Sequence, residues 1–236
     1  LQRLYKNVQF GVGPDIDNGF YYDVFTKKPI TIEDLPKIEA EMRNIIKENL
    51  PFSKFELSIN NGKNLFKKLN QKFKLELIDD LKNFGTTNIS EIEKLKDLPK
   101  KKIKGDKSIS VYVLGENIKK AQAKSKHTTN VLFTKKDLLK LQDKNKVFVD
   151  LCRGPHIKST KDVPDTFKLV NVAGAYWRGN EKNKMLTRIY GVAFLDKQEM
   201  DEYSNMLTEA EKRDHKKLGL ALDIFFLDDT APGMPY

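Results

Sequence analysis

The sequence contains little cysteine, tryptophan or histidine, and each shortage limits what the protein can be. Its 236 residues include one cysteine, one tryptophan and three histidines. A single cysteine excludes an internal disulfide framework and a zinc site built from cysteines alone. It is typical of a reducing compartment, which we expect to be the cytoplasm. No run of about 18 apolar residues predicts a membrane span, and no segment has the pattern of a signal peptide.

The basic residues are mostly lysine and are concentrated in the middle of the chain. Of the 43 Lys and Arg residues, 37 are Lys and 6 are Arg. Residues 60–146 hold 22 of them against 10 Asp and Glu, whereas the rest of the chain holds 21 against 23. A basic surface attracts a polyanion such as RNA and makes its binding salt-dependent. A lysine-rich coding bias and a solvated surface explain the same excess, so charge alone leaves both interpretations open.

Hydrophobic periodicity predicts an α+β fold, with a mostly antiparallel sheet and packed helices. Strands are expected near residues 20–25, 55–59, 73–77, 109–113, 147–149, 166–177 and 185–195, with a further strand from 224 to 227. Helices are expected over 32–48, around 65–69, and over 197–219. The last helix is expected to turn these residues inward: Met200, Tyr203, Met206, Leu207 and Ala210. Two lysine-rich segments, near 79–106 and 116–146, have little pattern and predict inserted loops and marginal helices.

The clearest group of reactive side chains follows a predicted strand, at Asp150, Cys152 and His156. Residues i and i+2 of a strand point to one face, so Asp150 and Cys152 are expected to share a face. The turn at 154–155 then brings His156 back toward Cys152. These groups fit a cysteine nucleophile with a histidine base, part of a metal site, or a site that positions water for hydrolysis. A buried cysteine and a turn-capping histidine fit the same spacing.

A second group surrounds the only tryptophan, in the segment 173–179 (AGAYWRG). The aromatic rings of Tyr176 and Trp177, next to Arg178, can stack on the bases or the ribose at a nucleic-acid end. Anchoring of a hairpin in the core explains the same residues. The two other histidines are less informative, since His127 lies in a lysine-rich segment and His215 in a charged helix.

Five blocks in a fixed order make the sequence resemble bacterial-type threonyl-tRNA synthetases. They are residues 13–23 (GPDIDNGFYYD), 149–156 (VDLCRGPH), 173–179 (AGAYWRG), 213–219 (RDHKKLG) and 231–234 (APGM). The Cys-x-x-x-His spacing is shared with alanyl-tRNA synthetases and their free-standing editing relatives, whereas the third and fourth blocks favour the threonyl family. The resemblance covers almost the whole chain apart from the lysine-rich segments.

The resemblance implies three regions: an editing domain over 1–195, a linker helix over 196–222, and the start of a class II aminoacylation domain over 223–236. In this family the editing domain hydrolyses seryl-tRNA that was made in error on threonine tRNA. Serine lacks one methyl group of threonine, and a missing methylene is worth only about 1–3 kcal/mol in a binding pocket. A second, hydrolytic site is therefore needed to remove the wrong product.

The resemblance also implies catalytic roles for four residues. Cys152 and His156 match the second half of the family's editing site, Asp150 matches its neighbouring acid, and Lys74 matches a functional lysine on a strand. His156 is expected to orient or deprotonate a water that attacks the aminoacyl ester, and Lys74 to activate that water or stabilise oxyanion charge. Asp150 is expected to hold the substrate's ammonium group, and Cys152 to line the pocket.

The resemblance also predicts contacts with the tRNA acceptor end and further segments on both sides of this sequence. The resemblance implies that Tyr176, Trp177 and Arg178 support the acceptor end. It implies a His-x-x-x-His helix upstream of Leu1, and ATP-binding motifs beyond Tyr236. The sequence therefore predicts a fragment cut at both ends, impaired in editing and unable to make threonyl-tRNA.

The expected partner is threonine tRNA, with neither DNA nor a membrane. No cofactor is expected within the chain, whereas the family's full-length enzyme is a homodimer that uses ATP, Mg²⁺ and a catalytic zinc ion. Two other functions remain open: a non-catalytic module that binds the tRNA acceptor stem, and a free-standing deacylase of the alanyl type. Cys152 and His156 are at most part of a metal site.

Overall fold

The computed structural model describes residues 1–17, 19–115, 141, 143, 146–213, 218–219, 222 and 224. Several predicted features lie outside these residues. They are His127, His215, nearly all of the lysine-rich segment 116–146, most of the predicted strand at 224–227, and the block at 231–234.

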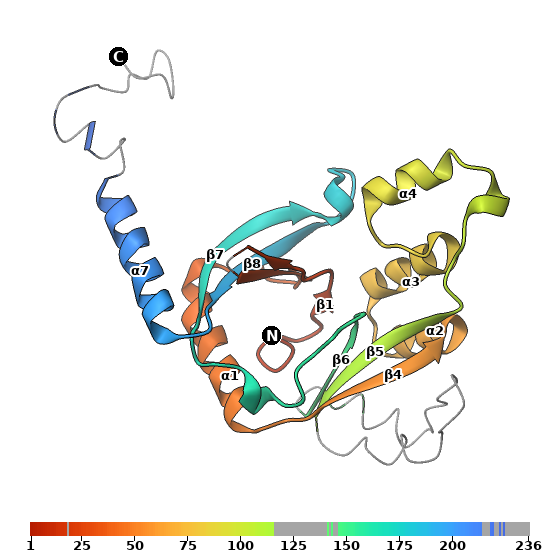
Figure 1. The fold of residues 1–236 in the computed structure, drawn as a ribbon, viewed down its shortest axis with the longest axis horizontal. Coiled ribbons are helices and arrows are strands. Elements are labelled where there is room, and N and C mark those ends of the chain that lie inside the picture. Colours follow the sequence, from red (N-terminus) through yellow and green to blue (C-terminus); the bar gives the residue numbers. More distant parts are fainter. Residues whose placement is uncertain are drawn as a thin grey trace.

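Two antiparallel sheets form the centre of the described structure (Figure 1). The first has the strand order β1–β3–β8–β7, with β2 paired to β3, and the second has the order β4–β5–β6. The strands of the first sheet are β1 (Gln9–Phe10), β2 (Asp15–Ile16), β3 (Gly19–Phe25), β7 (Phe167–Tyr176) and β8 (Met185–Ala193). Those of the second are β4 (Phe52–Ser58), β5 (Ser108–Gly115) and β6 (Val147–Leu151). The predicted α+β class with antiparallel strands is confirmed.

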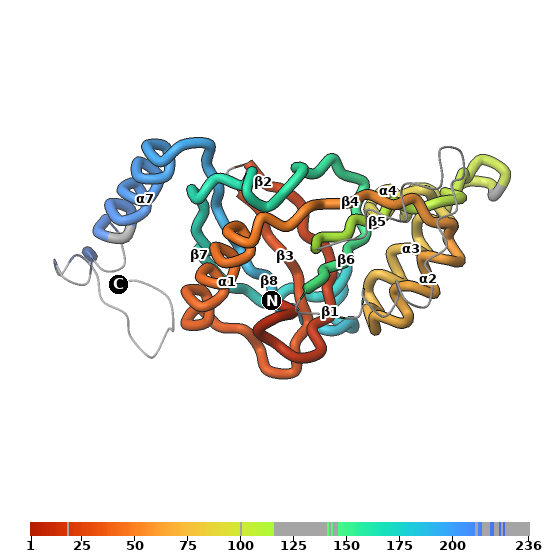
Figure 2. The backbone as a smooth tube through the Cα atoms, turned by 90° about the horizontal axis from the view of Figure 1, so that it is seen from below, coloured from red at the N-terminus to blue at the C-terminus, as the bar shows by residue number. Residues whose placement is uncertain are grey.

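The helices divide between the two sheets. Helix α1 (Leu35–Lys47) follows the 3-10 turn η1 (Ile32–Asp34) and packs on the first sheet, whereas α2 (Ile59–Lys68) and α3 (Lys72–Phe84) pack on the second. The remaining helical elements are α4 (Ile89–Lys96), η2 (Lys100–Lys102), η3 (Thr160–Asp162), η4 (Trp177–Gly179) and α7 (Lys197–Lys212). Figure 2 shows α2 and α3 at one end of the molecule and α7 at the other. Within the described residues, no helix has the length and apolar character needed to cross a bilayer.

Local sequence signals explain the predicted helices that the structure contains. At the start of the first helix, the Asp34 carboxylate accepts a hydrogen bond of 3.0 Å from the Thr31 backbone N–H, which satisfies a donor at the helix entrance. The Ser58 hydroxyl similarly accepts one from the Asn61 N–H at 3.4 Å, and so caps α2. The helices predicted over 32–48 and around 65–69 are confirmed as η1–α1 and α2.

The prediction of a strand at 73–77 is wrong, because these residues lie in the helix α3. Alternation of Phe73, Leu75 and Leu77 resembles a strand over five residues, but the longer window has a helical period. The side chains buried along α3 are Phe73, Lys74, Leu77, Ile78 and Leu81, which recur at spacings of three and four. Lys74, expected on a strand, is therefore presented by a helix.

The adjacent segment 79–106 is also more regular than predicted. Helix α3 continues to Phe84 and ends at Gly85, whose φ of 72° is the left-handed conformation that glycine adopts readily. Helix α4 then begins after Asn88, whose side chain accepts a hydrogen bond from the Glu91 N–H at 3.3 Å. Ile92 of α4 is buried, so this helix is packed against the body of the protein.

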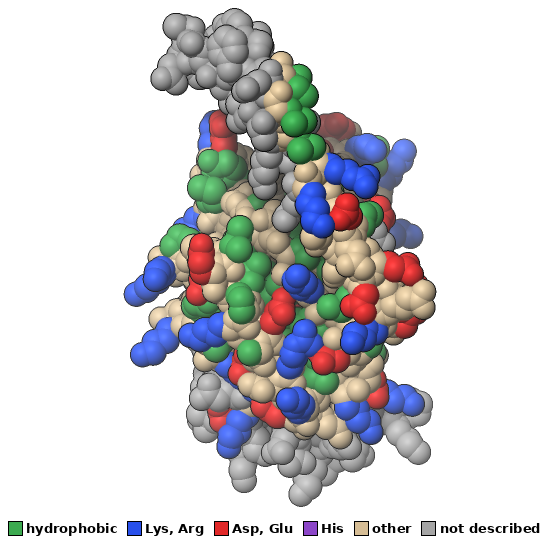
Figure 3. Space-filling view, turned by 90° about the vertical axis from the view of Figure 1, so that its left-hand side faces the viewer, with side chains coloured by type: hydrophobic (Ala, Val, Ile, Leu, Met, Phe, Trp, Pro, Cys, Tyr) green, Lys and Arg blue, Asp and Glu red, His purple; other side chains and the backbone are tan. Residues whose placement is uncertain are grey.

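Helix α7 is confirmed as a helix, but its predicted apolar face is not buried. Met206 is 56% exposed and Leu207 is 38% exposed, and Ala210 is also exposed. The Tyr203 ring packs against Phe194 at a centroid distance of 5.3 Å. Figure 3, which views the side of the molecule on which α7 lies in Figure 1, shows acidic and basic side chains interspersed over this face. The helix extends away from the two sheets, which explains why its apolar residues remain exposed (Figure 1).

Candidate functional site

The candidate site is a cleft of about 600 Å³ that lies against one face of the second sheet. The two faces of this sheet differ, because neighbouring residues of a strand point to opposite sides. One face carries apolar residues that pack with α2 and α3: Phe55, Leu57, Ile109, Val111, Val113, Val147 and Val149. The other face lines the cleft with Phe52, Ser110, Tyr112, Leu114, Phe148, Asp150 and Cys152. Lys74 and His156 line the same cleft, so the four predicted catalytic residues are brought together.

Lys74, Asp150 and Tyr22 form one hydrogen-bonded group in this cleft. The Lys74 Nζ atom lies 2.5 Å from Asp150 Oδ1. The Tyr22 hydroxyl donates a hydrogen bond of 2.5 Å to Asp150 Oδ2, and it accepts one of 3.4 Å from Lys74 Nζ. The three residues come from α3, β6 and β3, so this group connects both sheets through the helix.

The protonation state of Tyr22 follows from its surroundings. Burial raises the pKa of the Tyr22 phenol well above its usual value, and the negative charge of Asp150 raises this pKa further. The phenol therefore stays protonated and acts as a donor to the carboxylate. Tyr22 was not among the predicted site residues, although it lies in the block 13–23. Its role depends on the pairing of β3 and on the position of β6, which periodicity within one segment does not reveal.

Cys152 and His156 flank a tight turn after β6. The Cys152 N–H extends the strand pairing by donating to the Ser110 carbonyl at 3.3 Å. The Gly154 N–H donates to Cys152 Sγ at 3.4 Å, so the thiol sulfur is held against the turn. Gly154 has a φ of 73°, and a Cβ atom there would come within 2.0 Å of the Tyr112 hydroxyl oxygen. Glycine is therefore required at this position by both conformation and space.

The His156 imidazole lies between two aromatic rings. It stacks on Phe52 with a centroid distance of 5.4 Å and an interplanar angle of 11°. Tyr112 contacts it at a centroid distance of 4.2 Å and an angle of 58°. Partial burial lowers the pKa of His156, and the Asp150 carboxylate acts in the opposite direction. The net result favours a neutral imidazole at pH 7, which can accept a proton.

The other predicted group, Tyr176 to Arg178, lies outside this cleft. The Trp177 ring is buried against Phe73 at a centroid distance of 4.8 Å, and its Nε1 donates a hydrogen bond of 2.8 Å to Glu76. Arg178 donates to Asp80 at 2.6 Å. These contacts anchor the hairpin to α3. Of the two aromatic residues in this group, Tyr176 is 45% exposed and Trp177 is 5% exposed.

The donors at the cleft do not complete a metal site. Among the described residues, no group of three or more His, Cys, Asp or Glu side chains is placed to hold a metal ion. Cys152 and His156 supply two donors, whereas a zinc site in a protein needs at least three protein ligands. The described side chains of the cleft supply a lysine, a carboxylate, an imidazole and a thiol.

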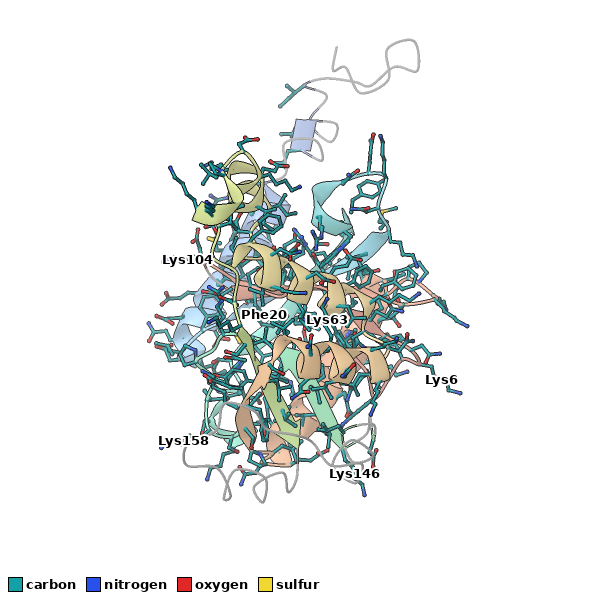
Figure 4. The ribbon with its side chains drawn as sticks, turned by 90° about the vertical axis from the view of Figure 1, so that its right-hand side faces the viewer. Lys6, Phe20, Lys63, Lys104, Lys146 and Lys158 are labelled. Carbon is teal, nitrogen blue, oxygen red and sulfur yellow. The ribbon has the colours of Figure 1, made fainter. Side chains whose placement is uncertain are left out.

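Several exposed lysine side chains lie outside the set of residues that line the cleft. Figure 4 shows Lys6, Lys104, Lys146 and Lys158 pointing outward at the periphery of this view. At the cleft itself the exposed cation is Arg153, which donates to the Gly85 carbonyl at 2.7 Å and lies 3.7 Å from Asp106.

Comparison with known proteins identifies the class of domain whose sequence matches the region around the Cys-x-x-x-His turn. Residues 134–190 match the family described as the threonyl and alanyl tRNA synthetase second additional domain. The match includes β6, the turn with Cys152 and His156, β7 and part of β8.

Comparison with individual proteins shows similarity to one kind of enzyme along the whole chain. The chain is 42% identical to the threonine–tRNA ligases of Thermotoga neapolitana, over 240 residues, and of Clostridium novyi, over 236 residues. It is 40% identical to that of Geobacillus sp. over 236 residues. Each alignment covers 100% of the chain but only 28–29% of the relative. The resemblance to threonyl-tRNA synthetases that the five blocks predicted is confirmed along the whole chain, which corresponds to less than a third of these enzymes.

Proposed function

We propose that this chain carries the editing site of a threonine–tRNA ligase and hydrolyses the ester of seryl-tRNA. The observation that supports this proposal best is the convergence of Lys74, Asp150, Cys152 and His156 on one cleft. They come from α3, β6 and the turn after β6, so the fold brings together residues that are up to 82 positions apart. In one cleft, a neutral imidazole can act as a general base, and a lysine can stabilise the charge that develops when water attacks an ester.

In the proposed reaction, His156 accepts a proton from a water while the water oxygen bonds to the ester carbonyl carbon. The resulting tetrahedral intermediate carries negative charge on the former carbonyl oxygen. When this intermediate collapses, the bond to the terminal ribose oxygen breaks, and that oxygen takes the proton from the imidazolium. The products are serine and a tRNA with a free terminal hydroxyl group.

The Lys74 ammonium group is suited to stabilise the oxyanion. An ammonium has three N–H donors, and Lys74 uses two of them, toward Asp150 and Tyr22. The third is available for the oxyanion or for the attacking water. Because Lys74 is buried and is fixed by two partners, its charge needs little reorganisation during the reaction.

The Asp150 carboxylate has room for one further donor, such as the ammonium group of serine. Its Oδ1 atom accepts from Lys74 and from the Leu151 N–H at 2.7 Å. Its Oδ2 atom accepts from Tyr22. A carboxylate has about four acceptor positions, so one position on Oδ2 remains. Cys152 lines the cleft with its sulfur held by Gly154, and we assign it to binding water or substrate rather than to an acyl intermediate.

The remaining properties of the full-length enzyme are proposed from the relatives. We propose that such an enzyme joins threonine to tRNA in the cytoplasm, as a homodimer. ATP, Mg²⁺ and a zinc ion would act in its aminoacylation domain, outside the cleft described here. The tRNA acceptor end would enter the cleft past Arg153. The resemblance also implies an upstream His-x-x-x-His helix, so we expect the 236-residue chain to edit more slowly than a longer chain that includes that helix.

The proposal is tested by mixing the purified chain with seryl-tRNA and threonyl-tRNA and following hydrolysis of each ester. The double variant Cys152→Ala with His156→Ala is the blank, and Lys197→Ala on α7 is a matched surface control. Faster loss of the seryl ester than of the threonyl ester, abolished in the blank and kept in the control, is the expected result. If even the longer chain shows no hydrolysis above the blank but binds tRNA, the non-catalytic binding module is the better description. Tight stoichiometric zinc would instead favour the alanyl-type deacylase.

A further inference from the structure

The two aromatic rings around His156 come from one face of the second sheet. Phe52 of β4 is paired with Leu114 of β5, and Tyr112 lies two residues before Leu114, so both rings project from the same face as neighbours on a diagonal. Asp150 of β6 is paired with Tyr112 and shares that face. The position of the imidazole is therefore tied to the same strands that position the carboxylate.

The rings contact the faces of the imidazole and leave its nitrogen atoms free for chemistry. The Phe52 ring is nearly parallel to the imidazole, whereas the Tyr112 ring is tilted toward it. None of the hydrogen bonds formed among the described residues involves a ring nitrogen of His156. Many catalytic histidines are oriented by a hydrogen bond to the ring nitrogen that does not take part in proton transfer. Here the contacts with the two aromatic rings can orient the imidazole instead.

Tyr112 also supports the turn that carries His156. Its hydroxyl oxygen packs directly on the Cα atom of Gly154, since a Cβ there would lie 2.0 Å from it. Tyr112 is 9% exposed, and its ring position is fixed by the sheet. One buried side chain thus contacts both the turn and the imidazole.

We propose that Phe52 and Tyr112 are positioning residues that clamp the His156 imidazole in the orientation needed for ester hydrolysis. This inference rests on the proposed function, and it adds two residues that act through His156 rather than on the substrate. Aromatic contacts of this kind favour defined geometries beyond simple burial. Misplacement of a catalytic group by about 1 Å costs about 10²-fold in rate, so loosening the clamp should lower kcat with little change in KM.

The test combines the kinetics of the purified chain with NMR spectra of its histidine rings. Rings stacked on an imidazole shift its carbon-bound protons upfield, and these resonances are assigned by their loss in His156→Gln. The variants are Tyr112→Phe, which keeps the ring, and Tyr112→Leu and Phe52→Leu, which remove one ring each. Phe194→Leu removes a half-buried ring that packs on Tyr203, far from the cleft, and is the matched control.

We expect upfield His156 resonances in the wild type, Tyr112→Phe and Phe194→Leu, and a downfield return in Tyr112→Leu and Phe52→Leu. The two ring deletions should lower kcat for the seryl ester by about 10- to 100-fold, and Tyr112→Phe should retain most of it. If Tyr112→Leu fails to fold, Phe52→Leu at its half-buried position decides the question.

Unshifted His156 resonances in the wild type would overturn the clamp. Shifted resonances that return in the ring deletions without a fall in kcat would overturn the positioning role while leaving the proposed hydrolysis intact. Absence of hydrolysis by the wild type and by a longer chain would overturn the proposed function and, with it, the kinetic role of the rings. The resonances would then still decide whether the rings hold the imidazole.

Discussion

Lys74 Nζ and Asp150 Oδ1 are separated by 2.5 Å, and this ion pair joins α3 to β6 in a buried part of the molecule. The side chain of Lys74 is 4% exposed and that of Asp150 is 18% exposed. A buried charge is stable in a protein only when it is paired and hydrogen-bonded. We therefore expect this pair to contribute to the stability of the protein. In the proposed reaction it also holds the Lys74 cation in place.

Removal of one partner should destabilise the protein more than removal of both. Lys74→Met leaves Asp150 buried without its cation, and we expect a loss of about 3 kcal/mol in the free energy of unfolding. The double variant Lys74→Met with Asp150→Leu replaces the pair by apolar side chains and should recover most of that loss. Urea unfolding of Lys74→Met, Asp150→Leu and the double variant measures the coupling between the two residues. Additive losses would contradict a direct interaction.

The phenol of Tyr22 is expected to contribute to both stability and rate. Tyr22→Phe removes the donor to Asp150 Oδ2, and a hydrogen bond to a charged group is worth about 1.5–3 kcal/mol. The carboxylate and Lys74 then lose a fixed partner, so hydrolysis of the seryl ester should slow as well. Tyr21→Phe on the same strand is the control, because Tyr21 does not line the cleft. Equal losses of stability and rate in the two variants would show that Tyr22 has no particular role in the site.

The lowered pKa of His156 predicts the pH dependence of hydrolysis. The imidazole accepts a proton only when it is neutral, so kcat/KM should be constant at high pH and fall as pH decreases through the pKa of His156. Since burial lowers this pKa from 6.5, the midpoint of the fall should lie below pH 6.5. A rate profile between pH 4.5 and 8 measures it, and His156→Gln should remove the inflection along with most of the rate. A midpoint above 6.5 would mean that the charge of Asp150 outweighs burial.

The sequence predicted most strands correctly because their apolar alternation reflects burial of a single face. It also located Asp150, Cys152 and His156 together, since all three lie within seven residues of one strand and turn. Two features required knowledge of the whole fold. The helical period of α3 is visible only over more than two turns, and the partnership of Tyr22 with Asp150 joins residues that are 128 positions apart.

The position of Trp177 leads to a final prediction about RNA binding. Its indole is buried against Phe73 and hydrogen-bonded to Glu76, so Trp177→Ala should cost about 3–5 kcal/mol in stability. Trp177→Phe keeps most of the buried area and should leave the Kd for threonine tRNA unchanged. Tyr176→Ala should change the melting temperature little, because Tyr176 is 45% exposed. It should weaken tRNA binding, since stacking of an aromatic ring on a base is worth about 1–3 kcal/mol. Filter binding and thermal unfolding of the same samples separate the two effects. A weaker Kd for Trp177→Phe at unchanged stability would show that the hairpin, rather than Tyr176 alone, contacts the RNA.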